Sequence, residues 1–112
     1  MKVFIVGSGG REDSICWKLR QEGVGVFKSP EYIAFSGNND LVVIGPEAPI
    51  AEGLVDKLES RDIPVFGPTK LAGRLETSKL WSKQFMQRHN IPTSNFRLFK
   101  RNMGWKICKS FL

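Results

Sequence analysis

Residues 2–12, KVFIVGSGGRE, decide the fold, because an apolar run leads directly into a glycine-rich turn. A short apolar run that ends at a glycine is typical of a buried strand, so we expect a strand over residues 2–6. The glycines of residues 7–10 let the backbone turn sharply, and they let amide groups approach an anion with no Cβ in the way. The pattern therefore predicts a strand, a tight turn and the start of a helix.

The rest of the chain continues this alternation of strands and helices. We expect further strands over residues 24–27, 40–44, 63–66 and 96–99. We expect helical segments over residues 11–22 and 31–35. Two further helical segments are expected, one that has Pro49 in its first turn and continues to Leu58, and one from Thr69 to about Ile91. Strands that alternate with helices form parallel strands joined by right-handed crossovers. The predicted fold class is α/β with a doubly wound parallel sheet.

The charge is concentrated at one end of the chain. The 112 residues carry a formal net charge of +6, which invites a nucleic-acid interpretation. Residues 97–112 contain five basic residues and no acidic one, so they account for +5 of that charge. These basic residues are Arg97, Lys100, Arg101, Lys106 and Lys109. A basic groove over the folded body, and hence a nucleic-acid partner for it, is not expected.

The composition indicates neither a membrane protein nor a metal protein. No apolar run approaches the roughly 18 residues that a membrane helix needs. The two cysteines, Cys16 and Cys108, lie far apart and match no metal-ligand spacing, so we expect reduced thiols, no metal site and a cytoplasmic protein. We also find no convincing nucleophile–base pair and no carboxylate cluster for magnesium, so no catalytic residue is assigned.

The first candidate site is the turn that contains Gly9, Gly10, Arg11 and Glu12. The N-terminus of a helix carries a positive partial charge, and an arginine guanidinium can bind phosphate through two parallel hydrogen bonds. A dinucleotide-binding fingerprint needs a third glycine where Glu12 stands, which disfavours a nicotinamide cofactor. We interpret the turn as a phosphate-binding site; the alternative is a tight strand-to-helix turn with no ligand.

The second candidate site is the loop Gly45, Pro46, Glu47, Ala48 and Pro49, which directly follows an apolar strand. Ligands of open parallel sheets bind beyond the carboxyl ends of the strands, so we expect this loop and the glycine turn to border one crevice. The two prolines make the loop stiff. Glu47 would then accept hydrogen bonds from a ribose hydroxyl or face an amine; the alternative is a solvated glutamate in a rigid turn.

Three other features receive a structural interpretation. His89, near a predicted helix end, is expected to be a surface or capping histidine. Trp81, Phe85 and Met86 lie at helical spacing and are expected in the core, not in a stacking platform. Residues 97–112 are expected to be solvated, although their aromatic residues leave an RNA-binding arm open. Those aromatic residues are Phe99, Trp105 and Phe111.

The segments MKVFIVGSGGRE, DLVVIGPEAP, FGPTKLAGRLETSK and FMQRHNIPT, in this order, resemble the N-terminal region of phosphoribosylamine–glycine ligase, also called glycinamide ribonucleotide synthetase. The resemblance covers most of residues 1–99. It implies an enzyme that joins phosphoribosylamine to glycine through a glycyl phosphate intermediate, with ATP and Mg²⁺ as cofactors. It also implies a Rossmann-like domain that precedes an ATP-grasp domain.

By this resemblance Gly9, Gly10 and Arg11 help to hold the phosphate of phosphoribosylamine, and residues 45–49 border the substrate crevice. The implied domains are residues 1–75, the substrate-binding α/β domain; residues 76–99, a linker helix and the start of the ATP-grasp region; and residues 100–112, a divergent basic tail. The family binds ATP and Mg²⁺ through residues further along. Neither is therefore expected to bind strongly to this chain alone, which is expected to be inactive without the missing ATP-grasp portion.

Three departures from the family pattern qualify these expectations. Asp13 stands where the family usually has histidine, and a carboxylate beside an anion site would repel phosphate by about 1 kcal/mol at a surface-like dielectric. Residues 28–39 are shorter than the corresponding family stretch, so one strand–helix unit is expected to be missing. The tail after Phe99 does not resemble the family. Two other functions stay open: a non-catalytic module whose sheet edge pairs with a partner, and nucleic-acid binding through the tail.

Overall fold

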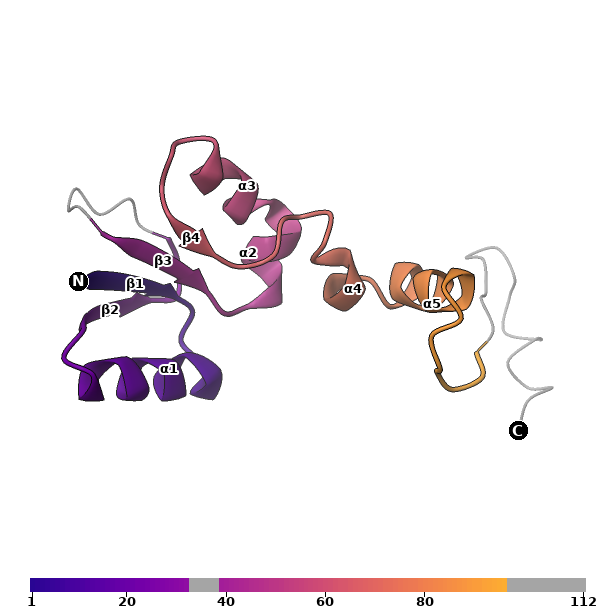
Figure 1. Ribbon diagram of the computed structural model, residues 1–112, viewed down its shortest axis with the longest axis horizontal. Helices are drawn as coiled ribbons and strands as arrows, with labels where there is room; N and C mark the ends of the chain where they lie inside the picture. The colour runs from indigo at the N-terminus through magenta and orange to yellow at the C-terminus, as the bar shows by residue number, and fades with distance from the viewer. Residues whose placement is uncertain (33–38, 97–112) are drawn as a thin grey trace.

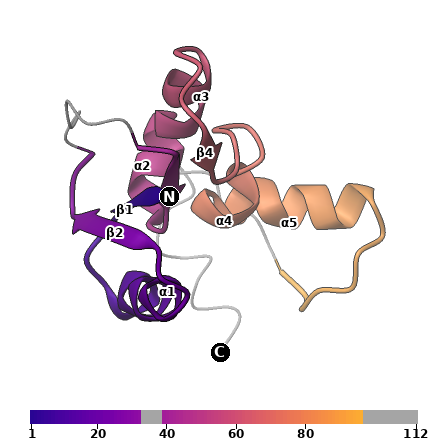
Figure 2. The ribbon, with the colours of Figure 1, turned by 60° about the vertical axis from the view of Figure 1, so that its left-hand side comes forward.

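The computed structural model describes residues 1–32 and 39–96. Its elements are β1 (Lys2–Val6), α1 (Gly10–Gln21), β2 (Gly25–Ser29), β3 (Leu41–Ile44), α2 (Glu47–Glu52), α3 (Leu54–Glu59), β4 (Val65–Phe66), α4 (Arg74–Thr77) and α5 (Lys79–Arg88). The four strands form one parallel sheet in the order β2-β1-β3-β4. Helix α1 covers one face of the sheet, and α2 and α3 cover the other (Figures 1 and 2). The predicted α/β fold with a doubly wound parallel sheet is confirmed.

The core consists of two apolar layers, one on each face of the sheet. Because successive strand residues point to opposite faces, β1 contributes to both layers. The layer under α1 contains Val3, Ile5, Cys16 and Val43, with Ile15 and Leu19 packed against it. The layer under α2 and α3 contains Phe4, Val6, Val42, Ile44, Ile50, Val55 and Leu58. Burial on both faces explains why the central strands are continuous apolar runs and not alternating ones.

The strand order creates a switch point between β1 and β3. The connection from β1 through α1 leads to β2 on one side, whereas the connection from β2 returns past β1 to β3 on the other side. Only eleven residues separate Ser29 from Leu41, and within them the Tyr32 ring packs edge-on against Phe4 with centroids 5.7 Å apart. Most of the helical segment predicted over residues 31–35 lies outside the described residues. Ligands in such sheets bind where the connections diverge.

The helical stretch after β3 differs from the prediction in its continuity. It begins at Glu47, has Pro49 in its first turn as expected, and is divided by Gly53 into α2 and α3. Gly53 adopts the left-handed conformation with φ of 82°, which ends one helix and starts the next. Of the predicted apolar stripe, Ile50, Val55 and Leu58 are buried, but Ala51 is exposed.

The long helix predicted after Thr69 is wrong in its extent, because Ser78 interrupts it. Thr69 begins a turn, in which its hydroxyl accepts a hydrogen bond from the Ala72 amide at 3.3 Å. Ser78 then adopts an extended conformation, and its hydroxyl accepts a hydrogen bond from the Trp81 amide at 3.3 Å. Serine at this position is a typical N-cap, so the chain forms two helices where one was expected.

Helices α4 and α5 form an arm that projects from the body (Figures 1 and 2), and the longest extent of the molecule is 56 Å against 29 and 28 Å in the other directions. The prediction that Trp81, Phe85 and Met86 lie in the core is wrong, because α5 does not reach the sheet. All three are half-buried and belong to neither core layer. Trp81 stacks on Phe85 at 5.2 Å, and Phe85 contacts the His89 ring at 4.4 Å.

The remaining predictions concern boundaries. His89 is exposed and caps the C-terminal end of α5, as expected. Strand β2 begins one residue later and ends two residues later than predicted, and β4 comprises only its last two predicted residues. Phe96 is not in a strand, and the rest of the strand predicted over residues 96–99 lies outside the described residues. Over residues 1–32 and 39–96 the helices are all too short or too polar to cross a bilayer.

Candidate functional site

The two predicted loops lie next to each other at the switch point of the sheet. Strands β1 and β3 pair with Val6 opposite Ile44, and the Gly45 amide donates a hydrogen bond to the Val6 carbonyl at 3.3 Å. The glycine turn after β1 and the Gly45 loop after β3 therefore leave the same edge of the sheet. They border one cavity of about 370 Å³. Its lining residues are Gly7, Ser8, Gly9, Gly10, Arg11, Glu12, Pro30, Pro46 and Glu47.

Glu12 is buried between the two loops. Its side chain is 4% exposed, and its Oε2 accepts a hydrogen bond from the Gly9 amide at 2.7 Å. The backbones of Gly7 and Gly45 approach the same carboxyl group, and a Cβ at Gly45 would lie only 2.0 Å from Glu12 Oε1. Both glycines are therefore required by close approach. Glutamate at the third position of a helix, reaching back to the cap amide, is a recognisable sequence signal that favours this structural role.

Arg11 connects the two loops from the solvent side. Its Nη1 donates a hydrogen bond to the Gly45 carbonyl at 2.6 Å, and its Nη2 lies 3.6 Å from Glu47 Oε1. The side chain stays 57% exposed. Because a guanidinium carries five N–H donors, Arg11 can hold the Gly45 loop and still offer donors to a ligand at the cavity mouth.

The first turn of α1 supplies amide donors to the cavity. Amides in the first turn of a helix have no acceptor within the helix, and the helix dipole gives them a positive partial charge. The Gly9 amide is already bonded to Glu12, whereas Gly10 and Arg11, whose amides have no acceptor within the helix, line the cavity. The cavity thus combines backbone donors with one guanidinium, an arrangement that suits phosphate.

Glu47 places a negative charge on the rim of the cavity. Its own backbone amide at the start of α2, followed by the Arg11 guanidinium, holds the pKa of the Glu47 carboxyl below its usual range. Glu76 of α4 contributes to the lowered pKa of Glu47 in the same direction. The resulting stabilisation is present above the unfolded-state pKa and is lost as pH falls through the lower folded-state value. Half-exposure of Glu47 keeps that contribution small.

A second cavity of about 480 Å³ adjoins the first. Pro30 and Pro46 line both cavities, whereas the predicted residues Ala48 and Pro49 line only the second. Its other lining residues are Val6, Glu31, Tyr32, Glu52, Leu54 and Lys57. Sequence reasoning did not identify Tyr32 or Glu76 near the site, because neither belongs to a local motif and only folding brings them there.

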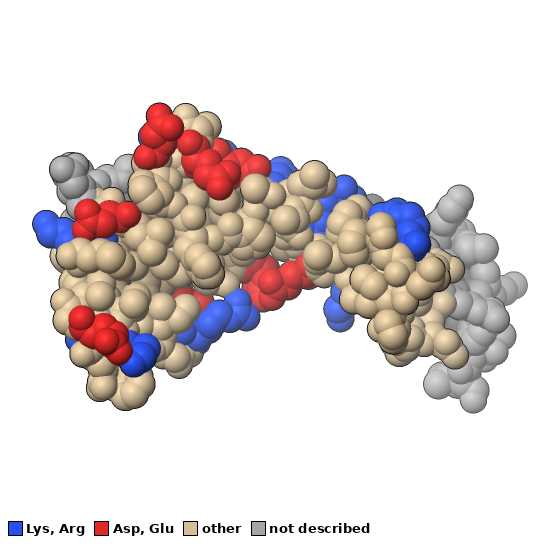
Figure 3. All heavy atoms as spheres, viewed as in Figure 1, with Lys and Arg blue, Asp and Glu red and all other residues tan. Residues whose placement is uncertain are grey.

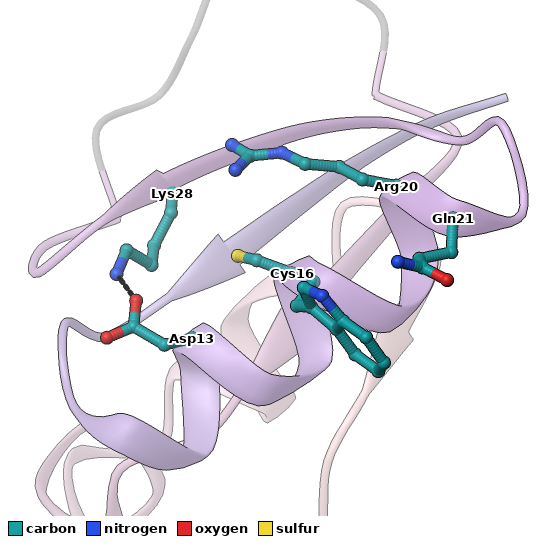
Figure 4. A pocket seen from close by; sticks show the side chains of 6 residues that line it. Asp13, Cys16, Arg20, Gln21 and Lys28 are labelled. Carbon is teal, nitrogen blue, oxygen red and sulfur yellow. Dashed lines mark hydrogen bonds and ion pairs between the residues drawn. The ribbon is translucent and has the colours of Figure 1, made fainter.

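Asp13, in the first turn of α1, does not line the glycine-turn cavity. It forms an ion pair with Lys28 of β2, and the hydrogen bond to Asp13 raises the pKa of Lys28 above its ordinary value. The two residues line a separate cavity of about 360 Å³ between α1 and β2, together with Cys16, Trp17, Arg20 and Gln21 (Figure 4). The negative charge of Asp13 is therefore paired with Lys28.

The surface charges agree with a small, local site. On the face in Figure 3 acidic side chains gather over α3, basic side chains gather over the arm, and the body carries both signs. Across residues 1–32 and 39–96, no group of three or more His, Cys, Asp or Glu side chains is arranged to hold a metal ion. At the site itself, Arg11 and the N-terminal amides of α1 supply positive charge.

Comparison with known proteins identifies relatives along most of the chain. Residues 28–76 match the family model described as "Phosphoribosylglycinamide synthetase, N domain". The phosphoribosylamine–glycine ligase of Clostridium acetobutylicum is 34% identical over 126 residues, which covers 91% of this chain. The ligase of Ralstonia nicotianae is 39% identical over 88% of the chain, and the trifunctional purine biosynthetic protein adenosine-3 of Chironomus tentans is 38% identical over 88%.

The lengths of these matches are informative. The chain spans about 30% of the length of the two ligases and 9% of the trifunctional protein. The aligned stretches of 123 to 127 residues exceed the 112 residues of the chain, so the relatives contain residues with no counterpart here. This excess agrees with the expected loss of a strand–helix unit, whose position between β2 and β3 stays a prediction.

Proposed function

We propose that the glycine turn of this chain, which belongs to the family of phosphoribosylglycinamide synthetase N domains, binds the phosphate of a phosphoribosyl compound. The natural ligand in this proposal is phosphoribosylamine, the substrate named by the ligases to which the chain is similar. Residues 1–75 would act as the substrate-binding domain and residues 76–99 as the linker to an ATP-grasp region. The role is binding and presentation of one substrate of a carbon–nitrogen ligase.

The single observation that supports this proposal is the junction of the two loops at the switch point. Gly10 and Arg11 bring amide donors from one loop, and Glu47 brings a carboxylate from the other, to a single cavity. A phosphate needs the donors, and a ribose hydroxyl or an amine needs the acceptor. A phosphoribosyl compound carries both kinds of group, so it matches the two sides of the cavity at once.

The direct test is a calorimetric titration of the 112-residue chain with ribose 5-phosphate. We expect saturable binding that Arg11→Ala weakens by tenfold or more, because hydrogen bonds to charged groups contribute about 1.5–3 kcal/mol. Arg20→Ala is the matched control, since Arg20 lies on the same helix but lines the separate cavity near Lys28. Equal losses in both variants, or a loss in Arg20→Ala alone, would contradict the assignment.

Glu47→Gln tests the contributions of the phosphate and the ribose of the ligand separately. The substitution removes the carboxylate that competes with a ligand for Arg11, so inorganic phosphate should bind about two- to fivefold tighter. Ribose 5-phosphate should gain less or bind more weakly, because its hydroxyl groups lose a charged acceptor. A parallel change for both ligands would show that Glu47 does not contact the ribose.

We also propose that these 112 residues bind the substrate without turning it over. Under this proposal ATP and Mg²⁺ would be held by residues of the ligases beyond the stretch that this chain matches, and those residues would supply the charge stabilisation for phosphoryl transfer. A coupled assay with ATP, Mg²⁺, glycine and phosphoribosylamine should therefore detect no product above the background without protein. Product formation that depends on the purified chain would refute this part of the proposal.

A partner-binding role is the second candidate, and β2 supports it. Within the described residues β2 pairs only with β1, so it forms an edge of the sheet, and Phe27 on this strand is 48% exposed. Edge strands can accept a strand from another protein. Size-exclusion chromatography that reveals a stable dimer or heteromer, together with no response to ribose 5-phosphate, would favour this function over phosphoribosyl binding.

A further inference from the structure

The second cavity lies beside the proposed phosphate site. Pro30 and Pro46 line both cavities, so the two spaces adjoin at these prolines. At about 480 Å³ this space falls in the range of roughly 300–1,000 Å³ that is usual for small-molecule sites. It is larger than a single amino group or a glycine molecule requires.

The lining of the second cavity contains apolar and charged residues. The apolar residues, called the apolar wall below, are Val6, Pro30, Tyr32, Pro46, Ala48, Pro49 and Leu54. The charged residues are Glu31, Glu52 and Lys57. A planar heteroaromatic ring has apolar faces and polar edges, so it fits a cavity of this kind. A small polar group would leave the apolar wall in contact with water.

Tyr32 is the aromatic residue of this wall, and it lies three residues after the end of β2. Its ring is half-buried against the core layer under α2 and α3, and it meets Phe4 edge-on with centroids 5.7 Å apart. Phe4 is 1% exposed and therefore a fixed support. The tyrosine ring is thus held in place before any ligand arrives, and aromatic rings held in this way are suited to stacking with a base.

We propose that the two cavities together bind a nucleoside 5′-monophosphate, with the phosphate at the glycine turn and the base against Tyr32. The inference rests on the proposed phosphate site, and it widens the ligand class from phosphoribosylamine to ribosyl phosphates that carry a ring. Glu52 and Lys57 face the edge of the base, where they supply an acceptor and a donor.

The test compares two probes that share the phosphate and the ribose. Adenosine 5′-monophosphate and ribose 5-phosphate are titrated separately into the full chain, and their dissociation constants are expressed as a ratio. We expect the nucleotide to bind about tenfold tighter or more, as base stacking on an aromatic side chain allows. Tyr32→Ala should bring the ratio close to one, whereas Tyr32→Phe, which keeps the ring, should preserve it.

A second variant covers the case in which Tyr32→Ala does not fold. Glu52 is exposed and lines the cavity, so Glu52→Trp should fill the space and lower the ratio. Glu59→Trp is the matched control, because Glu59 is exposed on α3 and does not line the cavity. A ratio near one in the wild-type chain, or a ratio that survives both cavity variants, overturns the inference and leaves the phosphate site standing. Failure of both probes to bind refutes the phosphate site as well.

Discussion

The body and the arm of this molecule are stabilised in different ways. In the body, the sheet has a helical layer on each face, and residues such as Phe4 and Leu58 are 1% exposed. In the arm, α5 packs mainly on α4, and Ser82 is its one buried residue. Ring contacts and the Ser78 cap stabilise α5, with Arg74 lying 5.0 Å over the Trp81 ring, and α4 packs against α2 of the body.

This difference explains where a binding site can form. The glycine turn and the Gly45 loop are anchored to adjacent buried strands, so their backbone donors keep a fixed geometry in the absence of a ligand. The stacked side chains of the arm depend on contacts between residues four apart on one helix, which are individually weak. We therefore assign the site to the body, and we expect the arm to open locally at lower cost than the sheet.

The largest expected effect comes from comparing two Phe→Ala variants, one in the body and one in the arm. Phe4→Ala should lower the free energy of unfolding by about 3–5 kcal/mol, because it leaves a cavity between the sheet and α2–α3. Phe85→Ala should cost only about 0.5–1.5 kcal/mol, because it removes ring contacts in the arm. Urea denaturation of both variants measures the difference. Similar losses would mean that the arm is part of the cooperative core.

Alanine substitutions at two glycines test how closely the two loops pack at the site. Gly45→Ala should destabilise the chain by about 1–3 kcal/mol and weaken ribose 5-phosphate binding, because the new Cβ would lie 2.0 Å from Glu12 Oε1. Gly10→Ala is the control for stability: its added Cβ meets nothing within 4 Å, so stability should stay level or rise slightly. Thermal denaturation distinguishes them. A harmless Gly45→Ala would show that Glu12 does not fix the two loops.

The cap of α5 provides a smaller effect that is confined to the arm. Ser78→Ala should cost about 1 kcal/mol, because the Trp81 amide loses its acceptor. Hydrogen exchange should accelerate at α5 amides and stay unchanged at β1 and β3. Ser78→Asp keeps an acceptor at the cap and serves as the control. Faster exchange in the sheet of Ser78→Ala would show that the arm and the body unfold together.

The smallest effect concerns the Asp13–Lys28 pair at the edge of the body. The raised pKa of Lys28 means that the pair stabilises the fold below the unfolded-state lysine pKa of 10.5 and loses this effect as pH rises through the higher folded-state value. The melting temperature of Asp13→Asn should therefore lie slightly below that of the wild type near neutral pH, and the two should converge only as pH rises through the raised folded-state pKa of Lys28.

The same Asp13→Asn variant also tests whether the negative charge of Asp13 acts on the proposed phosphate site. Ribose 5-phosphate affinity should change by less than about twofold, because Asp13 is paired with Lys28 and lines the cavity between α1 and β2. A clear gain in affinity would restore the view that Asp13 repels phosphate at the glycine turn. Lys18→Ala, which disrupts an exposed pair with Glu22 on the same helix, is the control for general charge effects.

Sequence patterns predicted the sheet well and the arm poorly, and the reason is physical. Strands β1 and β3 are buried on both faces, so their apolar runs carry a strong signal. The apolar positions Trp81, Phe85 and Met86 have the same helical spacing as a core stripe, yet they pack on their own neighbours. Spacing indicates that a face is apolar but does not indicate what covers it.

The candidate site likewise has features that local sequence patterns predict and features that depend on tertiary contacts. The local pattern of Gly9, Gly10 and Arg11 indicates an anion-binding turn, because each helix N-terminus creates its own donors. The buried position of Glu12 between two glycine backbones, and the arrival of Tyr32 and Glu76 near the Gly45 loop, depend on contacts between distant segments. No local motif encodes these contacts.

The sequence by itself determined the alternation of strands and helices, the two loops and the family resemblance, since each follows from residue types at short spacing. Only the tertiary structure decided that Glu12 faces inward, that Asp13 is paired with Lys28, and that a second cavity opens beside the first. These features arise from side chains brought together by the strand order, and strand order is set by the packing of the whole sheet.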